Sequence, residues 1–179
     1  MRFGCSLLGA MLVFAATLGA AQAEDATPSV KVPLRDPAMA TAFAKAASTL
    51  DEFLVKWRDP PAGSKYFTVK IGIQDTATPP GYSLVLPGAG EGDDKIEWFW
   101  TAGLSEEGSG FSALLSNEPE TVHNVKNGQM IHFERRHIGD WMYVQNGKIV
   151  GNATACPALA HASAAERKDA MDGYGLNCE

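Results

Sequence analysis

The chain has 179 residues, a formal net charge of −6 and 20% charged residues. That length suits one ordinary domain with a hydrophobic core. The acidic, unpatterned composition argues against binding to nucleic acid or to anionic lipid, and it names no partner.

The first 23 residues have the pattern of a secretory signal peptide. Arg2 gives a positive start, and the apolar run Leu7–Leu18 is too short to span a membrane. Ala21-Gln22-Ala23 is a typical cleavage site. We expect cleavage near Ala23 and a periplasmic or secreted mature protein without a transmembrane segment. Residues 24–35 are then expected to be a flexible tether.

A long amphipathic helix follows. Asp36 suits the N-cap and Pro37 suits the first turn. Apolar residues then recur at steps of three and four, as a helix with one buried face requires: Met39, Phe43, Ala46, Leu50, Phe53 and Trp57. Asp59-Pro60-Pro61 ends the pattern. Such a stripe predicts core packing rather than a site.

Short runs with alternating or apolar character then predict strands. These runs are Tyr66–Gln74, Lys95–Ala102, Gly110–Ser116, Gln129–Arg135, Trp141–Gln145 and Lys148–Gly151. Asn146-Gly147 predicts a hairpin between the last two. A Gly/Pro-rich insertion occupies residues 76–94. One helix followed by strands with short turns predicts an α+β fold: an antiparallel sheet of about five strands, with one long N-terminal helix packed on a face.

The tail from residue 156 to 179 has a different character, so we expect the α+β domain to cover residues 36–155. Ser163 and Glu166 form a capping box, which predicts a short helix. Cys156 and Cys178 are an even pair in an exported chain, and we expect a disulfide that ties this helical tail. Such a bond stabilises by roughly 3 kcal/mol in the chain-entropy model. A redox-active thiol is the alternative, although the pair is not CxxC.

Several motifs in the second half of the chain together resemble one family. They are Glu97-Trp98-Phe99-Trp100, Asn117-Glu118-Pro119, Val125-Lys126-Asn127-Gly128-Gln129, Asp140-Trp141-Met142-Tyr143, Gly147-Lys148 and Gly151. The chain is similar to the YegJ-like family of domains of unknown function (DUF 2314). The resemblance implies a compact α+β domain. It implies no activity and no catalytic residues, because the family has no agreed function.

The histidines and carboxylates are the candidates for metal and acid–base chemistry. The histidines form no HExxH motif and have no cysteine at ligand spacing, so we expect no metal and no cofactor. A hydrolase would need carboxylates within hydrogen-bond reach of a base or a nucleophile. Glu118, His123 and Asp140 are the residues that could supply this chemistry. An envelope hydrolase that uses them is the alternative function.

The leading hypothesis is a binding surface on the sheet. Large aromatic residues lie on adjacent predicted strands, and one helix cannot cover both faces of a sheet. Phe99 lies opposite to Trp98 on its strand, so one of them must point to the second face. The candidate binding residues are Phe99, Trp100, Arg135, Arg136, Trp141 and Tyr143. We therefore expect a non-catalytic binding or accessory module of the periplasm, inhibitor-like or immunity-like, whose partner is another envelope protein.

Overall fold

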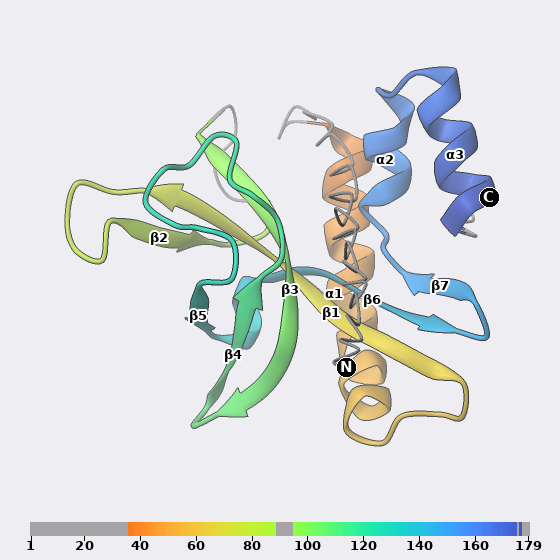
Figure 1. Cartoon of the computed structure of the whole chain (residues 1–179), viewed down its shortest axis with the longest axis horizontal. Helices are drawn as coiled ribbons and strands as arrows, with labels where there is room; N and C mark the ends of the chain where they lie inside the picture. Colours follow the sequence, from red (N-terminus) through yellow and green to blue (C-terminus); the bar gives the residue numbers. More distant parts are fainter. Residues whose placement is uncertain (1–35, 89–94, 175, 177–179) are drawn as a thin grey trace, which may run out of the picture.

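The structure is a computed structural model that describes residues 36–88, 95–174 and 176. These residues form a seven-stranded antiparallel sheet, three α-helices and one 3₁₀ turn. In chain order the elements are α1 (Pro37–Arg58), β1 (Ser64–Asp75), β2 (Tyr82–Val85), β3 (Ile96–Glu107), β4 (Gly110–Leu115), β5 (Met130–Phe133), the 3₁₀ turn (Arg135–His137), β6 (Ile138–Gln145), β7 (Lys148–Gly151), α2 (Ala155–Ala160) and α3 (Ala164–Tyr174). In Figure 1, α2 and α3 lie together at one end of the molecule.

The prediction of about five strands under an N-terminal helix is wrong in two respects. The sheet has seven strands: six follow the predicted runs, and the seventh, β2, lies inside the Gly/Pro-rich insertion. The packed helix is not N-terminal, since α1 begins only at Pro37. Four residues inside a Gly/Pro-rich stretch are too short a run to be recognised without their pairing partner, and β1 provides that partner.

The predicted disulfide between Cys156 and Cys178 is not part of the described fold. Cys156 lies in α2 and is not a free thiol, but Cys178 lies outside the described residues. The part of the chain that the structure describes therefore contains no complete disulfide. The predicted leader and tether, residues 1–35, also lie outside it. Among the described helices, none is both long enough and apolar enough to cross a membrane.

β1 is the central strand of the sheet, whose order is β5-β4-β3-β1-β6-β7. One edge of β1 pairs with β3. The other edge pairs first with β6, through Ser64–Ile71, and then with β2, through Gly72–Asp75. The β1–β6 pairing joins segments far apart in the chain, and it brings the start of β6 beside the middle of β1 (Figure 1).

The hydrophobic core lies between α1 and one face of the sheet, which we call the inner face. Four residues of α1 enter the core cluster: Ala46, Leu50, Phe53 and Leu54. They pack with inner-face residues that have no exposed surface: Val69, Ile71, Ile73 and Phe99. The expected N-cap is confirmed, because the Asp36 carboxylate accepts a hydrogen bond of 2.8 Å from the Ala38 N–H.

Two carboxylates hold the long β4–β5 connection on the sheet. Glu97 of β3 accepts hydrogen bonds from three successive backbone N–H groups, those of residues 120, 121 and 122. Asp75, at the end of β1, accepts from the N–H groups of His123 and Asn124. This connection has no strand or helix of its own, so these bonds replace the ladder that its backbone lacks.

Candidate functional site

The face of the sheet opposite to the core, which we call the outer face, carries a lysine and two tryptophans. Side chains alternate along a strand, so residues next to the buried Ile71 and Phe99 point outward. In the β1–β3 register Lys70 lies opposite Trp100 and Gly72 lies opposite Trp98. Lys70, Trp98 and Trp100 are partly exposed.

Trp98 lies flat on the backbone of its neighbours. A Cβ atom at Gly72 would come within 3.1 Å of the Trp98 ring, and one at Gly139 would come within 2.3 Å of it. Phe43, near the start of α1, packs on the same ring, with 4.7 Å between the ring centroids, so the start of α1 covers part of Trp98. The indole N–H of Trp98 is buried and has no hydrogen-bond partner among the described residues. An unpaired buried donor costs about 1–3 kcal/mol.

The Lys70 side chain is held by a hydroxyl and an aromatic ring. Its Nζ donates a hydrogen bond of 2.8 Å to Thr154 Oγ1 and lies 4.5 Å from the centroid of the Trp100 ring. Burial lowers the pKa of Lys70, and the nearby charge of Asp140 partly opposes this shift. No described carboxylate forms a direct ion pair with Lys70.

Asp140 is fully buried and its oxygens are all engaged. Oδ1 accepts from the N–H groups of Trp141 and Ala153, at 2.8 and 3.3 Å. Oδ2 accepts from the N–H and the hydroxyl of Thr154, at 2.8 and 2.7 Å. The result is a chain of hydrogen bonds from Lys70 through Thr154 to Asp140. It joins β1, β6 and the turn before α2.

The residues of the predicted hydrolase lie in separate surroundings. Glu118 is exposed and accepts a hydrogen bond of 3.0 Å from the Asn127 side chain. His123 is exposed and contacts Asp75 through its backbone N–H. Asp140 is buried under Thr154. The described ranges contain no group of three or more His, Cys, Asp or Glu side chains that could hold a metal ion.

Most of the predicted binding residues have other positions in the structure. Phe99, Trp141 and Tyr143 are buried in the core, with 0%, 8% and 1% of their surface exposed. Arg135 is exposed and pairs with Asp51, at 2.6 Å, and Arg136 pairs with Glu134, at 2.8 Å. Trp100 alone of the six lies on the outer face.

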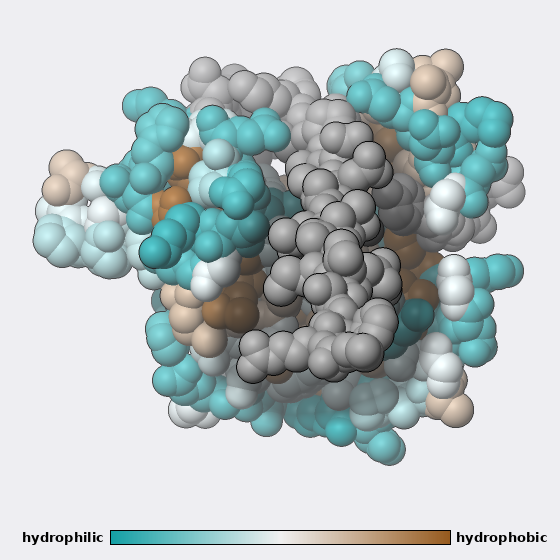
Figure 2. Space-filling model, viewed as in Figure 1, coloured by the Kyte–Doolittle hydropathy of each residue, from teal (hydrophilic) through white to brown (hydrophobic). Residues whose placement is uncertain are grey.

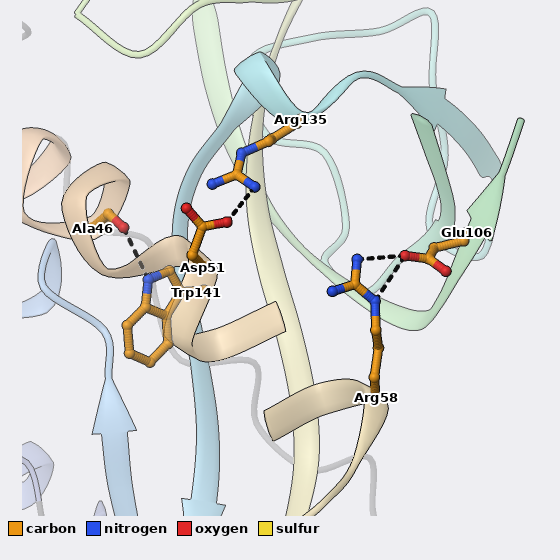
Figure 3. A network of polar contacts seen from close by, with 6 residues as sticks. All are labelled: Ala46, Asp51, Arg58, Glu106, Arg135 and Trp141. Atoms are coloured by element: carbon orange, nitrogen blue, oxygen red, sulfur yellow. Dashed lines mark hydrogen bonds and ion pairs between the residues drawn. The ribbon is translucent and has the colours of Figure 1, made fainter. Parts of the chain in front are cut away.

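Figure 3 shows two of these residues, Trp141 and Arg135, in contact with α1. The Trp141 indole N–H donates a hydrogen bond of 3.0 Å to the Ala46 carbonyl, within the helix. Arg135 reaches Asp51 on the exposed side of α1 (Figure 3). Sequence reasoning missed Lys70 and Thr154. The alternation of β1 could have found Lys70, because it places a lysine on the face opposite Ile71.

The motifs that carry the family resemblance are explained largely by these structural contacts. Glu97 holds the β4–β5 connection, Asn117 accepts from the Trp100 N–H at 3.0 Å, and Asp140 holds the turn before α2. Gly151 has a φ of +88°, and a Cβ there would lie 2.4 Å from the Trp141 carbonyl oxygen. The indole N–H of Trp98 makes no hydrogen bond within the described residues, and part of the Trp100 ring is exposed, so these contacts do not explain either feature.

The fold and this face define a small α+β sheet domain with an aromatic outer surface and no gathered catalytic group among its described residues. The family model described as "Uncharacterized protein conserved in bacteria (DUF2314)" matches residues 36–178. The chain belongs to this family, as its motifs predicted.

One relative is the uncharacterized protein YegJ of Escherichia coli (strain K12), which is 35% identical over 65 residues. That match covers 36% of this chain and 42% of the relative, so the chain spans less than half of the relative's length. No solved structure matches the chain.

Proposed function

We propose that this protein is a small exported binding module of the bacterial envelope, which acts without catalysis. The observation that carries the proposal is the outer face around Lys70, Trp98 and Trp100. It combines partly exposed aromatic rings with a buried donor that has no partner in the described chain. Clusters of aromatic and cationic side chains are typical of binding surfaces.

The apolar character of this face continues across the neighbouring strands. Ala102 follows Trp100 on the same side of β3 and pairs with Leu114, which pairs in turn with Met130. Leu114 and Met130 keep 37% and 48% of their surface exposed. Figure 2 shows hydrophobic residues at the surface over β4, among mostly hydrophilic ones. A row of this kind suits contact with another macromolecule.

The proposed compartment is the periplasm or the extracellular space, after removal of residues 1–23. The signal-like pattern of the leader supports this assignment. The proposed partner is another envelope protein, and an inhibitor-like or immunity-like role fits a module of this size. Immunodetection of the protein in periplasmic and cytoplasmic fractions tests the location, and recovery in the cytoplasm alone would refute it.

The binding proposal is tested with the partly exposed Trp100 and the exposed Tyr66. The exported protein is cross-linked in its own cells, and its partners are identified for the unaltered chain, for Trp100→Ala and for Tyr66→Ala. Tyr66 is 69% exposed and is the matched control, because it lies at a distant part of β1. We expect a stoichiometric partner that is lost with Trp100→Ala and kept with Tyr66→Ala. Equal recovery with both variants would refute the proposed face.

The hydrolase alternative has less support in this geometry. One of its two candidate carboxylates, Asp140, already accepts four hydrogen bonds from Trp141, Ala153 and Thr154. Its two other residues, Glu118 and His123, are exposed on the β4–β5 connection. The same three residues are therefore better explained as parts of the fold.

A further inference from the structure

The 3₁₀ turn Arg135–His137 contains a histidine that accepts a hydrogen bond from the backbone. The N–H of Glu134 donates to His137 Nδ1, at 3.2 Å. The N–H of His137 donates in turn to the Glu134 carbonyl, at 2.9 Å. A backbone N–H can only donate, so Nδ1 accepts with its lone pair, and a protonated imidazole has no lone pair left. The two bonds therefore exist together only while His137 is neutral.

This turn lies between a contact with α1 and the start of β6. Arg135 donates to Asp51 of α1, at 2.6 Å. The N–H of Ile138 donates to the Arg135 carbonyl, and the Ile138 side chain is buried in the core. The next residue, Gly139, lies against the Trp98 ring. A change in the turn therefore reaches a helix contact, a core residue and the backbone beside Trp98.

We propose that the Arg135–His137 turn is an acid-sensitive hinge at the start of β6, which opens when His137 takes up a proton on Nδ1. Protonation removes the acceptor of the Glu134 N–H and adds a positive charge close to that of Arg136. Histidine is the side chain whose ordinary titration lies closest to neutral pH, so mild acidification is a sufficient signal. The inference goes beyond the proposed binding function and requires no partner or ligand.

The surroundings of His137 favour its neutral form in the closed turn. Burial lowers the pKa of His137, the charge of Arg136 lowers it further, and Glu134 opposes both. An opened turn would restore the ordinary pKa of about 6.5. The closed turn therefore has its full stability above about pH 6.5 and loses stability as pH falls from there, until the lowered pKa is passed. Acid favours the open turn.

Other charged groups around the turn come from three further elements. Asp51 of α1 pairs with Arg135. Glu107, at the end of β3, pairs with His132 of β5, at 2.8 Å, and both line the same surface hollow as Glu134. His132 is thus a second imidazole in this neighbourhood, and the experiment has to separate it from His137.

The ring of His137 is observed directly in the unaltered protein by nitrogen-15 NMR, with its signals assigned by through-bond correlation to the His137 backbone. We expect the ring proton on Nε2 and a bare Nδ1 at pH 7.5. The ring should then titrate below about pH 6.5. A proton on Nδ1 at pH 7.5 would overturn the inference, because the Glu134 N–H could not donate to it.

Opening of the turn is measured by hydrogen exchange at the Ile138 N–H, relative to the intrinsic exchange rate at each pH. Protection should fall by about three- to tenfold from pH 7.5 to pH 5, which corresponds to the loss of one hydrogen bond. His137→Asn should remove this pH dependence, because the asparagine side chain offers an acceptor that does not titrate. His132→Asn is the matched control and should keep it.

Three results would overturn the inference. The first is unchanged protection of Ile138 across this pH range. The second is the same pH dependence in His137→Asn as in the unaltered protein, and the third is its loss in His132→Asn alone, which would assign the titration to His132. If His137→Asn does not fold, the unaltered protein still decides. A His137 ring that titrates without any matching fall in the protection of Ile138 would show that its proton does not open the turn.

Discussion

The hydrogen-bond chain Lys70–Thr154–Asp140 has two ends, and they differ in how many of their donors and acceptors have partners. At Asp140 four donors converge on one carboxylate, and both oxygens are engaged. At Lys70 and Trp98 there are more donors than acceptors, and one buried N–H has no described partner. A saturated polar group holds a fold together, whereas an unsaturated one needs a functional explanation. The difference separates the structural end of this hydrogen-bond chain from the end at which we propose binding.

The largest expected effect is at the saturated end. Asp140→Ala should lower the free energy of unfolding by about 3–5 kcal/mol, because it leaves several buried N–H groups unpaired. Denaturation in urea, followed by far-ultraviolet circular dichroism, measures it. Asp140→Asn keeps one acceptor oxygen and should lose less. A small loss for Asp140→Ala would mean that Asp140 is not the structural centre we describe.

Gly151→Ala tests the backbone that brings the turn before α2 to Asp140. The residue has a φ of +88°, and a Cβ would meet the Trp141 carbonyl at 2.4 Å. The expected loss is about 2–3 kcal/mol, from the left-handed backbone and the overlap together. Gly128, with a φ of +74° and nothing within 4 Å, is the matched control. Gly128→Ala should cost only about 1 kcal/mol. Equal losses in urea denaturation would show that the overlap relaxes freely.

Loss of the Glu97 carboxylate, which holds the β4–β5 connection on the sheet, should have a smaller effect on global stability and a clear effect on the connection itself. Glu97→Ala should cost about 1–2 kcal/mol, because Glu120 is exposed and Thr121 is partly exposed, so their freed N–H groups can bond to water, whereas the N–H of the buried Val122 loses its partner. The β4–β5 connection should then be cleaved faster by a protease under native conditions. Glu118→Ala is the control. If Glu97→Ala is cleaved no faster than the control, Glu97 does not hold the connection in place.

The Lys70 end should have the smallest effect on stability, and the size of that effect depends on pH. Burial lowers the folded-state pKa of Lys70, so the folded state opposes protonation that the unfolded state accepts. Below the lowered pKa the ammonium therefore carries a stability penalty. The penalty fades as pH rises from that pKa towards the ordinary value of about 10.4.

Lys70→Met should therefore be neutral or stabilising at pH 7, within about 1 kcal/mol. Its advantage over the unaltered chain should shrink as pH rises through the same window. Urea denaturation of both proteins at pH 7 and at higher pH measures the difference. A loss of several kcal/mol at pH 7 would place Lys70 among the structural residues and remove the contrast with Asp140.

Local patterns were enough to predict the helix, most strands and the family. Asp36, Pro37 and an apolar stripe marked α1, and Asn146-Gly147 marked the β6–β7 hairpin, because these signals act over a few residues. The candidate binding residues were harder to predict. Phe99 and Trp100 are adjacent in the sequence, and only the position of α1 decides that Phe99 is buried and Trp100 is outside.

The sequence by itself determined the α+β class, the long helix, the hairpin and the family motifs, since propensity, capping and periodicity are local. The tertiary structure alone decided the pairing of β1 with β6, the strand inside the insertion and the meeting of Lys70 with Thr154 across 84 residues. Such contacts depend on which strand edges meet. Edge pairing is a property of the whole sheet, and no short stretch of sequence records it.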